Sequence, residues 1–210
     1  MIALRLTVPI ACWRKAHARE FLESEELPPP ATCYGALLSL VGEEDRERHV
    51  GCRVTAGRLG NFETSVVLRT LWQIKTRKEP QGNGQNIGPD FQQLLIGNEL
   101  VVWLDSSGEP EPSAGLEARV RRALASPETI DRFGGWSLGE STHLINDLVL
   151  LPGAAPPARC KAFLLAADGD VSLPVWVDHI GFERTRYAVG RIEQIATAPD
   201  VDALPRISSS

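Results

Sequence analysis

The stretch GGWSLGESTHLIND, which runs from Gly134 to Asp147, places a serine two residues before a histidine. With Ser141 as nucleophile and His143 as general base, the chemistry would be ester hydrolysis. The nucleophile elbow of such enzymes reads Gly-x-Ser-x-Gly between a strand and a helix, but the residue two positions after Ser141 is His143. A hydrolase is therefore the less favoured hypothesis. The other hypothesis is a glycine-rich loop whose backbone wraps a ligand.

Two basic windows are the second feature with chemical meaning. Residues 1–19 and residues 69–78 contain no acid, and Trp13 and Trp72 lie within them. Their basic residues are Arg5, Arg14, Lys15, Arg19, Arg69, Lys75, Arg77 and Lys78. Cations for phosphates and aromatic rings for stacking are what single-stranded RNA recognition uses. A solvated surface with scattered charges is the alternative, and the net charge of −5 argues only weakly against RNA, because binding depends on the local potential.

The spacing of histidines and cysteines indicates no metal site. The four cysteines form no Cys-x-x-Cys pair, and no two of the four histidines stand at ligand spacing. The glycines of GNGQNIG, residues 82–88, precede no helix and so do not form a dinucleotide-binding loop. We therefore expect no metal and no cofactor. No run reaches ~18 apolar residues and the N-terminal apolar stretch lacks a basic start, so we expect no membrane span, no signal peptide and a cytoplasmic protein with free thiols.

Hydrophobic periodicity predicts the elements that position these residues. Residues 2–8 alternate as a half-buried strand, with Ile2, Leu4, Leu6 and Val8 on one face, and Pro9 should end its place in the ladder. A helix is predicted within residues 28–42, where Thr32 could cap the start and Gly42 the stop. Its inward face would carry Tyr34, Leu37, Leu38 and Val41.

Further strands are predicted over residues 50–57, 64–76 and 98–105, and a second, amphipathic helix over 113–126. Between Thr76 and Gly97 the pattern dissolves, which indicates an extended hairpin or a mobile insertion. Within it, Phe91, Leu94 and Leu95 stand at i, i+3 and i+4, which predicts one short apolar face in need of a partner. Three short strands follow over 160–167, 174–180 and 186–192, and the tail from residue 199 should be frayed.

This order of elements predicts an α+β fold: a ferredoxin-like antiparallel sheet with two helices on one face. One lobe would span residues 1–145, with an insertion over 73–101. Residues 146–210 would form a small C-terminal β extension. At 210 residues, one domain with such an extension is the expected size.

Four segments together resemble the CRISPR-associated Cas family five, in the same order along the chain: PPPATCYGALLSLVG, RLGNF, GPDFQQLL and LGESTHLINDL. The resemblance covers most of Met1 to Leu150 and is closest to the type I-B-like branch, including its transposon-associated members. It implies a modified RNA-recognition-motif (RAMP) fold with a long β-hairpin thumb. The chain lacks an aromatic RNP1 segment, so stacking of bases on the sheet is not inferred.

The resemblance also implies a function. Such a protein is a noncatalytic subunit of a type I Cascade complex that targets DNA. It binds and caps the 5′ handle of the crRNA and bridges the backbone and large subunits. It contacts target DNA as part of the complex, and no membrane partner is expected. The RNA-binding residues would be Arg14, Lys15, His17, Arg19, Tyr34, Arg58, Lys75, Arg77, Lys78, Gln85, Asn86, Gly139, Ser141, Thr142 and His143. Partner contacts would come from Phe91, Leu94 and Leu95.

One alternative keeps the fold and changes the function. A crRNA-processing endoribonuclease of the type I-C kind would use His17 or His143 as general acid or base, together with Tyr34 or a lysine. A small hydrolase acting through Ser141 is an alternative from another class. Cleavage of repeat RNA and of an ester substrate by the pure protein would separate the three functions.

Overall fold

The computed structural model describes residues 1–18, 21–72, 78–80, 83–110, 114–132, 134–178 and 183–209. Its strands are β1 (Ile2–Ala11), β2 (Phe21–Leu22), β3 (Arg53–Leu59), β4 (Glu63–Trp72), β5 (Ile87–Asp105), β6 (Asp147–Leu150), β7 (Cys160–Leu165), β8 (Val171–Trp176) and β9 (Arg186–Ile195). The helices are α1 (Pro30–Leu40) and α2 (Leu116–Ala125), and short 3-10 turns are η1 (Gly84–Asn86), η2 (Pro127–Thr129) and η3 (Val201–Ala203).

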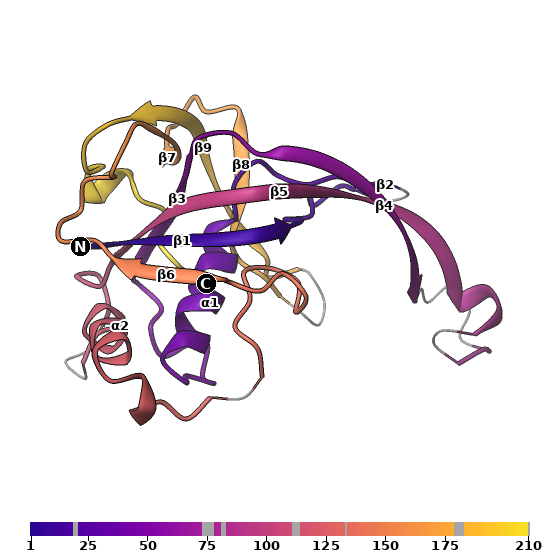
Figure 1. The fold of residues 1–210 in the computed structure, drawn as a ribbon, viewed down its shortest axis with the longest axis horizontal. Helices are drawn as coiled ribbons and strands as arrows, with labels where there is room; N and C mark the ends of the chain where they lie inside the picture. Colours follow the sequence, from indigo (N-terminus) through magenta and orange to yellow (C-terminus); the bar gives the residue numbers. More distant parts are fainter. Residues whose placement is uncertain are drawn as a thin grey trace.

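All of these strands belong to one sheet, in the order β6-β1-β5-β3-β7-β9-β8, while β2 and β4 pair with β5 beyond that row. The pairs are antiparallel except that of β2 with β5. Both helices lie on one face of the sheet (Figure 1) and share a core with its inward side chains. The predicted α+β class is confirmed. Neither helix in the described part of the chain has the length and apolar character needed to cross a bilayer.

Strand β1 shows how the sequence builds this layer. Ile2, Leu4, Leu6 and Val8 are at most 4% exposed and belong to the core that α1 and α2 cover. On the other face, Ala3 packs in a second cluster with Trp103 and Leu204. The prediction that Pro9 ends the ladder is wrong, because pairing with β5 resumes at Ile10 and Ala11. A proline removes only its own donor, so the strand continues past it.

Helix α1 begins with prolines in place of the predicted threonine cap. Pro29 is the N-cap and Pro30 the first helical residue, whereas Thr32 lies inside the helix. Proline suits the first turn, since the N–H groups there have no partner within the helix. The predicted inward face is confirmed, because Tyr34, Leu37, Leu38 and Val41 are all buried.

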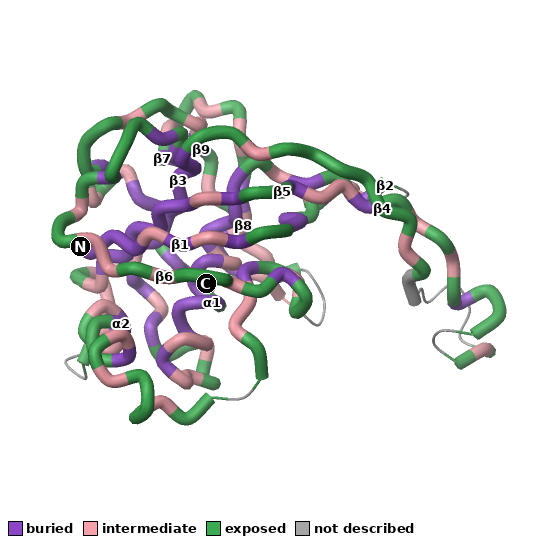
Figure 2. The backbone as a smooth tube through the Cα atoms, in the orientation of Figure 1, coloured by how far each residue is buried: buried purple, intermediate pink, exposed green. Residues whose placement is uncertain are grey.

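The predicted thumb is a β-hairpin arm formed by β4 and the first half of β5, which extends away from the body (Figure 1). Its described side chains are mostly exposed (Figure 2). The paired strands begin at Glu63, ten residues before the predicted start of the insertion, and the half of β5 that follows Gly97 belongs to the body. Residues 73–77 and 81–82 lie outside the described residues.

The arm leaves the body at a change of register. Leu59 pairs with Glu99, but Glu63, four residues later, pairs with Ile96, only three residues earlier on β5. Gly60 and Gly97 sit at this step with φ of 65° and 76°. Glycine adopts such values without steric cost, so these two positions let the hairpin bend out of the sheet.

The C-terminal segment is packed, so the prediction of a frayed tail is wrong. The backbone N–H of Ile207 donates to Cys52 O over 2.8 Å, and Val54 N–H donates to Pro205 O over 2.9 Å. Leu204 and Ile207 are both 0% exposed. On the edge of β3 that faces β7, only the last residues of β3 pair with β7. The C-terminal segment pairs with the first residue of β3 along that same strand. The division of the chain at residue 145 stays a prediction, and both parts contribute strands to the same sheet.

Candidate functional site

The glycine-rich loop that follows α2 is a tight, internally bonded turn. Leu138 N–H donates to His143 O over 3.0 Å, and His143 N–H donates to Glu140 O over 2.9 Å. The indole of Trp13 donates to Leu138 O over 3.1 Å. Gly139 has a φ of 113°, and a Cβ on it would lie 3.3 Å from Trp13 Cδ1. This turn leaves Ser141 and Thr142 exposed at its tip, where a ligand can meet them.

His143 faces inward from the same turn. Its side chain is 4% exposed, and its Nδ1 accepts a hydrogen bond from the backbone N–H of Cys12 over 3.4 Å. Burial lowers the pKa of His143 from its usual value, although the nearby carboxylate of Glu140 acts in the opposite direction. The described part of the chain shows no hydrogen bond between His143 and Ser141. The ring is therefore placed to support the loop, and not to touch a ligand or activate the serine.

Three other predicted RNA contacts are also turned into the protein. The Tyr34 hydroxyl donates to Arg46 O over 2.7 Å, and burial raises the pKa of Tyr34. Arg58 is 7% exposed, with its guanidinium 4.2 Å from the Phe62 ring centre. Asn86 is 1% exposed and its amide donates to Glu79 O over 2.7 Å. These side chains have structural roles in the free protein, which their polar character in the sequence does not reveal.

The remaining predicted contacts that the structure describes are exposed or partly exposed, but they do not form one cluster. Arg14 and His17 are exposed beside the body, and Lys15 there pairs with Glu23 over 2.7 Å. Gln85 lies in η1, which the ribbon shows at the far end of the arm, and Lys78 is exposed in the same connection (Figure 1). Arg19, Lys75 and Arg77 lie outside the described residues.

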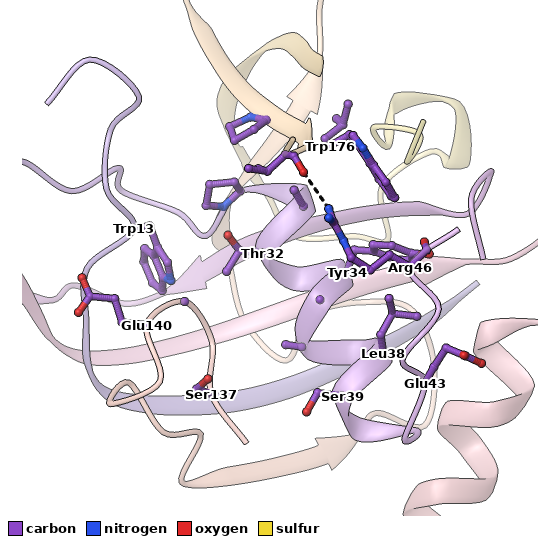
Figure 3. A pocket seen from close by; sticks show the side chains of 18 of the residues that line it. Trp13, Thr32, Tyr34, Leu38, Ser39, Glu43, Arg46, Ser137, Glu140 and Trp176 are labelled. Atoms are coloured by element: carbon purple, nitrogen blue, oxygen red, sulfur yellow. Dashed lines mark hydrogen bonds between the residues drawn. The ribbon is translucent and has the colours of Figure 1, made fainter. Parts of the chain in front are cut away.

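A groove of about 1000 Å³ runs along the outer side of α1, between the glycine-rich loop and β8 (Figure 3). Its floor includes Gly35, where a Cβ would meet nothing within 4 Å, so a ligand can approach the helix backbone closely. Its walls carry three arginines, several hydroxyls, two indoles and four acids: Arg14, Arg46, Arg132, Thr32, Ser39, Ser137, Trp13, Trp176, Glu43, Glu44, Asp131 and Glu140.

Arg46 and Trp176 form one wall of this groove, and neither was predicted to be functional. The Arg46 guanidinium stacks on the Trp176 ring at 4.4 Å from its centre and donates to Val177 O over 2.9 Å. Each residue is unremarkable in its own segment, and the stack exists only because β8 packs against α1. No local sequence signal could have paired them.

Glu140 is a second residue that the sequence did not single out. Its carboxylate bonds Arg69 on β4 over 2.6 Å and Gln92 on β5 over 2.7 Å. The acid thus joins the glycine-rich loop to both strands of the arm, next to the place where β2 pairs with Phe91 and Gln92. In the sequence, the available signs of this contact were a single acid, Glu140, in the glycine-rich loop and an arginine, Arg69, in a segment without acids.

The predicted apolar face of the arm is corrected in its members. Residues 91–95 form a strand and not a helical turn, so the spacing i, i+3, i+4 does not place them on one side. Leu95 is 1% exposed in the core and Leu94 is half-buried, whereas Phe91 is 54% exposed. Leu68 (60% exposed) and Phe21 (43% exposed) both pair with Phe91 across the strands. An exposed apolar row of Phe21, Leu68, Phe91 and neighbouring Val66 therefore lies across the arm.

Comparison with known proteins decides the family. The chain is 62% identical to the CRISPR-associated protein Cas5 of Myxococcus xanthus (strain DK1622) over 207 aligned residues. The alignment covers 99% of this chain and 97% of the relative. This chain belongs to the Cas5 family. The resemblance seen in the sequence is thus confirmed, while the type I-B-like branch and the association with transposons stay predictions. No family model matches the chain.

The fold of this Cas5 family member also occurs in a solved structure. A chain of a CRISPR RNA-guided surveillance complex aligns over 93% of this chain and 89% of its own length, with a TM-score of 0.62 and 14% identity. A second structure, described as a Cas protein, aligns over 98% of this chain and 97% of its own, with a TM-score of 0.48 and 16% identity. The first of these supports the RAMP-like sheet with its two helices as the family fold.

Proposed function

We propose that this Cas5 family member is a noncatalytic subunit of a type I Cascade complex that binds and caps the 5′ handle of the crRNA. Its partners are the crRNA, the backbone subunit and the large subunit, and it meets target DNA through the complex. The observation that carries this proposal is the 62% identity to a Cas5 protein along 99% of the chain. The similar fold found in an RNA-guided surveillance complex supports it.

The groove along α1 is the surface that suits the handle. Ser137 and Glu140 of the glycine-rich loop line one end, and the exposed Ser141 and Thr142 stand on the same turn. Arg14 also lines the groove. Hydroxyls and an arginine are donors for phosphates, and the open surface at Gly35 allows a ligand to approach closely. The two indoles bound the space where bases would lie.

The arm suits the contact with the neighbouring backbone subunit. Its exposed row of Phe21, Val66, Leu68 and Phe91 has no core of its own. An apolar surface on a projecting hairpin is stabilised when another protein covers it. We therefore assign the row, in place of the buried Leu95, to the bridging contact that the family resemblance implies.

The noncatalytic assignment is supported by the state of the candidate acid–base groups. His143 and Tyr34 are buried and hydrogen-bonded. Burial lowers the pKa of His143 and raises the pKa of Tyr34, so in both cases it favours the neutral side chain. A general acid or base must reach the reacting proton within hydrogen-bond distance. His17 is the exposed histidine in the basic N-terminal segment, so cleavage of repeat RNA that is lost in His17→Ala would promote the endoribonuclease alternative.

Copurification is the direct test. The protein, expressed with its repeat RNA, should retain a discrete short RNA that carries the repeat-derived 5′ end. The Arg14→Gln and Thr142→Ala variants should bind that RNA more weakly, and Arg14→Gln should lower the salt dependence by about one unit of slope. Arg122→Gln, an exposed arginine on α2 outside the groove, is the matched control. Retention of no RNA, or equal affinity in all three variants, would refute the proposal.

A further inference from the structure

Glu140 is an acid in the middle of the loop for which RNA binding is proposed, yet its carboxylate is directed at the arm. Arg69 Nη1 lies 2.6 Å from Oε2, and Gln92 Nε2 donates to Oε1 over 2.7 Å. Arg69 and Gln92 come from the two strands of the hairpin and lie on the same face, since Gln92 is paired with the residue two positions before Arg69. The loop and both strands of the arm thus meet at one carboxylate.

Burial makes this contact selective for one position of the arm. Gln92 is 0% exposed, and both ends of its amide are used: Oε1 accepts from Arg69, and Nε2 donates to Glu140. A buried donor that loses its partner destabilises the structure by its full desolvation cost. Any movement of the arm that separates Gln92 from Glu140 is therefore opposed.

The carboxylate itself is fixed by the turn that carries it. His143 N–H donates to Glu140 O, and the buried His143 ring is tied to the backbone of Cys12. Ser141 and Thr142 lie between these two anchors on the exposed side of the same turn. The position of the arm and the position of the exposed hydroxyls are thus set by a single four-residue segment.

The arm has freedom for the contact to restrict. It leaves the sheet at Gly60 and Gly97, both with positive φ and with open space where a Cβ would stand. Beyond that step, Ile10 and Ala11 of β1 still pair with Ile96 and Leu95, and Phe21 and Leu22 of β2 pair with Phe91 and Gln92. The backbone N–H of Ser24 also donates to Gln93 Oε1 over 3.0 Å. The part of β5 that precedes Phe91 pairs with β4 alone among the described strands, so this outer part of the hairpin can swing unless side chains hold it.

We propose that Glu140 is a positioning residue that locks the hairpin arm to the glycine-rich loop, so that the groove and the arm present one continuous surface to the RNA. This inference rests on the proposed function for its RNA part. The lock itself is a property of the free protein and can be measured without RNA.

The first experiment measures the arm in the free protein. Cysteines replacing the exposed Gln85 on the arm and the exposed Lys161 on β7 carry spin labels, while the four native cysteines are buried. Glu140→Ala should make the label-to-label distance distribution about twofold wider, because the arm becomes a low-stability segment. Arg69→Met, which removes the same ion pair from the arm side, should do likewise. Thr142→Ala, on the same turn without contact to the arm, should leave the distribution unchanged.

The second experiment uses the sign of a charge effect. Removal of an acid from an RNA-binding surface ordinarily strengthens binding, because it removes repulsion from phosphates. The lock predicts the opposite for Glu140→Gln: about tenfold weaker binding of the repeat-derived handle RNA, with the loss appearing as faster dissociation. Glu44→Gln, which removes an exposed acid from the same groove, is the matched control and should keep or raise the affinity.

The outcomes separate the lock from the proposed function. An unchanged distance distribution in both Glu140→Ala and Arg69→Met overturns the lock. So does affinity in Glu140→Gln equal to or above that of the parent. If the parent protein binds no handle RNA, the proposed function fails, and the distance measurement alone decides on the lock.

Discussion

Strand β5 passes through two environments within one run of 19 residues. From Leu100 to Asp105, in the body, no residue is more than 5% exposed. From Ile87 to Ile96, in the arm, Ile87, Phe91 and Ile96 are 38%, 54% and 36% exposed. Both halves contain large apolar side chains but have different roles: the body half stabilises the fold, and the arm half keeps apolar side chains available for contact with another molecule.

The largest effect on stability should come from the body half. Trp103 is 0% exposed and its indole donates to Ala154 O over 2.7 Å. Trp103→Ala should lower the free energy of unfolding by about 3–5 kcal/mol, measured by equilibrium denaturation in urea. Gly57→Ala gives a paired test, since its Cβ would lie 2.9 Å from Trp103 Cζ3. Gly57→Ala should lower the free energy of unfolding clearly in the parent protein but hardly at all in a protein that already carries Trp103→Ala. If the two losses of stability simply add, the packing of Trp103 against Gly57 is contradicted.

A smaller effect should depend on pH at the junction of body and arm. Burial lowers the pKa of His143, so the unfolded chain binds more protons than the folded one when the pH falls below about 6.5. Stability is therefore complete above that pH and declines as the pH falls toward the folded pKa. His143→Gln should flatten this part of the urea-midpoint profile, and exposed His17→Gln should not.

The acids whose pKa values are lowered act in a separate window. Burial acts to raise the pKa of Glu43 and of Glu109, but hydrogen bonds from Arg119 and His49, respectively, outweigh it. Both acids contribute stability above about pH 4.5 that is lost as they become protonated below it.

The His143 prediction is contradicted if His143→Gln leaves the pH dependence of the urea midpoint unchanged between about pH 7 and pH 5. His143 would then not be the cause of the loss of stability in that range.

Shortening the arm should matter still less to the body. Replacing residues 70–89 with Asn-Gly closes the hairpin with a favourable turn and keeps Arg69, Gln92 and Glu140. The free energy of unfolding should change by less than about 1 kcal/mol, because the body core is untouched. Assembly with the backbone subunit should be lost. A destabilisation as large as that of Trp103→Ala would show that the arm is part of the cooperative core.

The smallest effect on stability should follow from changes to the exposed row. Leu68→Ser with Phe91→Ser should shift the free energy of unfolding by no more than about 0.5 kcal/mol. The same variant should fail to retain the backbone subunit in a copurified complex, whereas Thr70→Ser, an exposed change on the same strand, should retain it. Normal retention by the double variant would remove the apolar row from the interface.

Regular, local patterns in the sequence predicted much of the fold. The alternation of β1, the inward face of α1, the second helix and the hairpin follow from periods of two and 3.6 residues. Register and burial did not follow, because they depend on segments far apart in the chain. The spacing of Phe91, Leu94 and Leu95 satisfied a helix, but pairing with β4 made it a strand.

The candidate site shows the same limit more strongly. Ser141 and Thr142 were predicted as contacts through the family resemblance, and the structure places them at an exposed tip. His143, Tyr34 and Arg58 look equally suitable in the sequence but are used within the protein. The sequence could not identify Glu140 as a positioning residue, because that role depends on its contacts with Arg69 and Gln92, which lie on the hairpin.

The packed C-terminal segment has a consequence for synthesis. Ile207 completes the core beneath the helices and Leu204 completes the cluster on the opposite face, and both reach their places through bonds to the beginning of β3. Both residues are synthesised long after β3, so neither core can close until synthesis has passed Ile207. The nascent protein should depend on a chaperone or on rapid release to protect the open edge of β3.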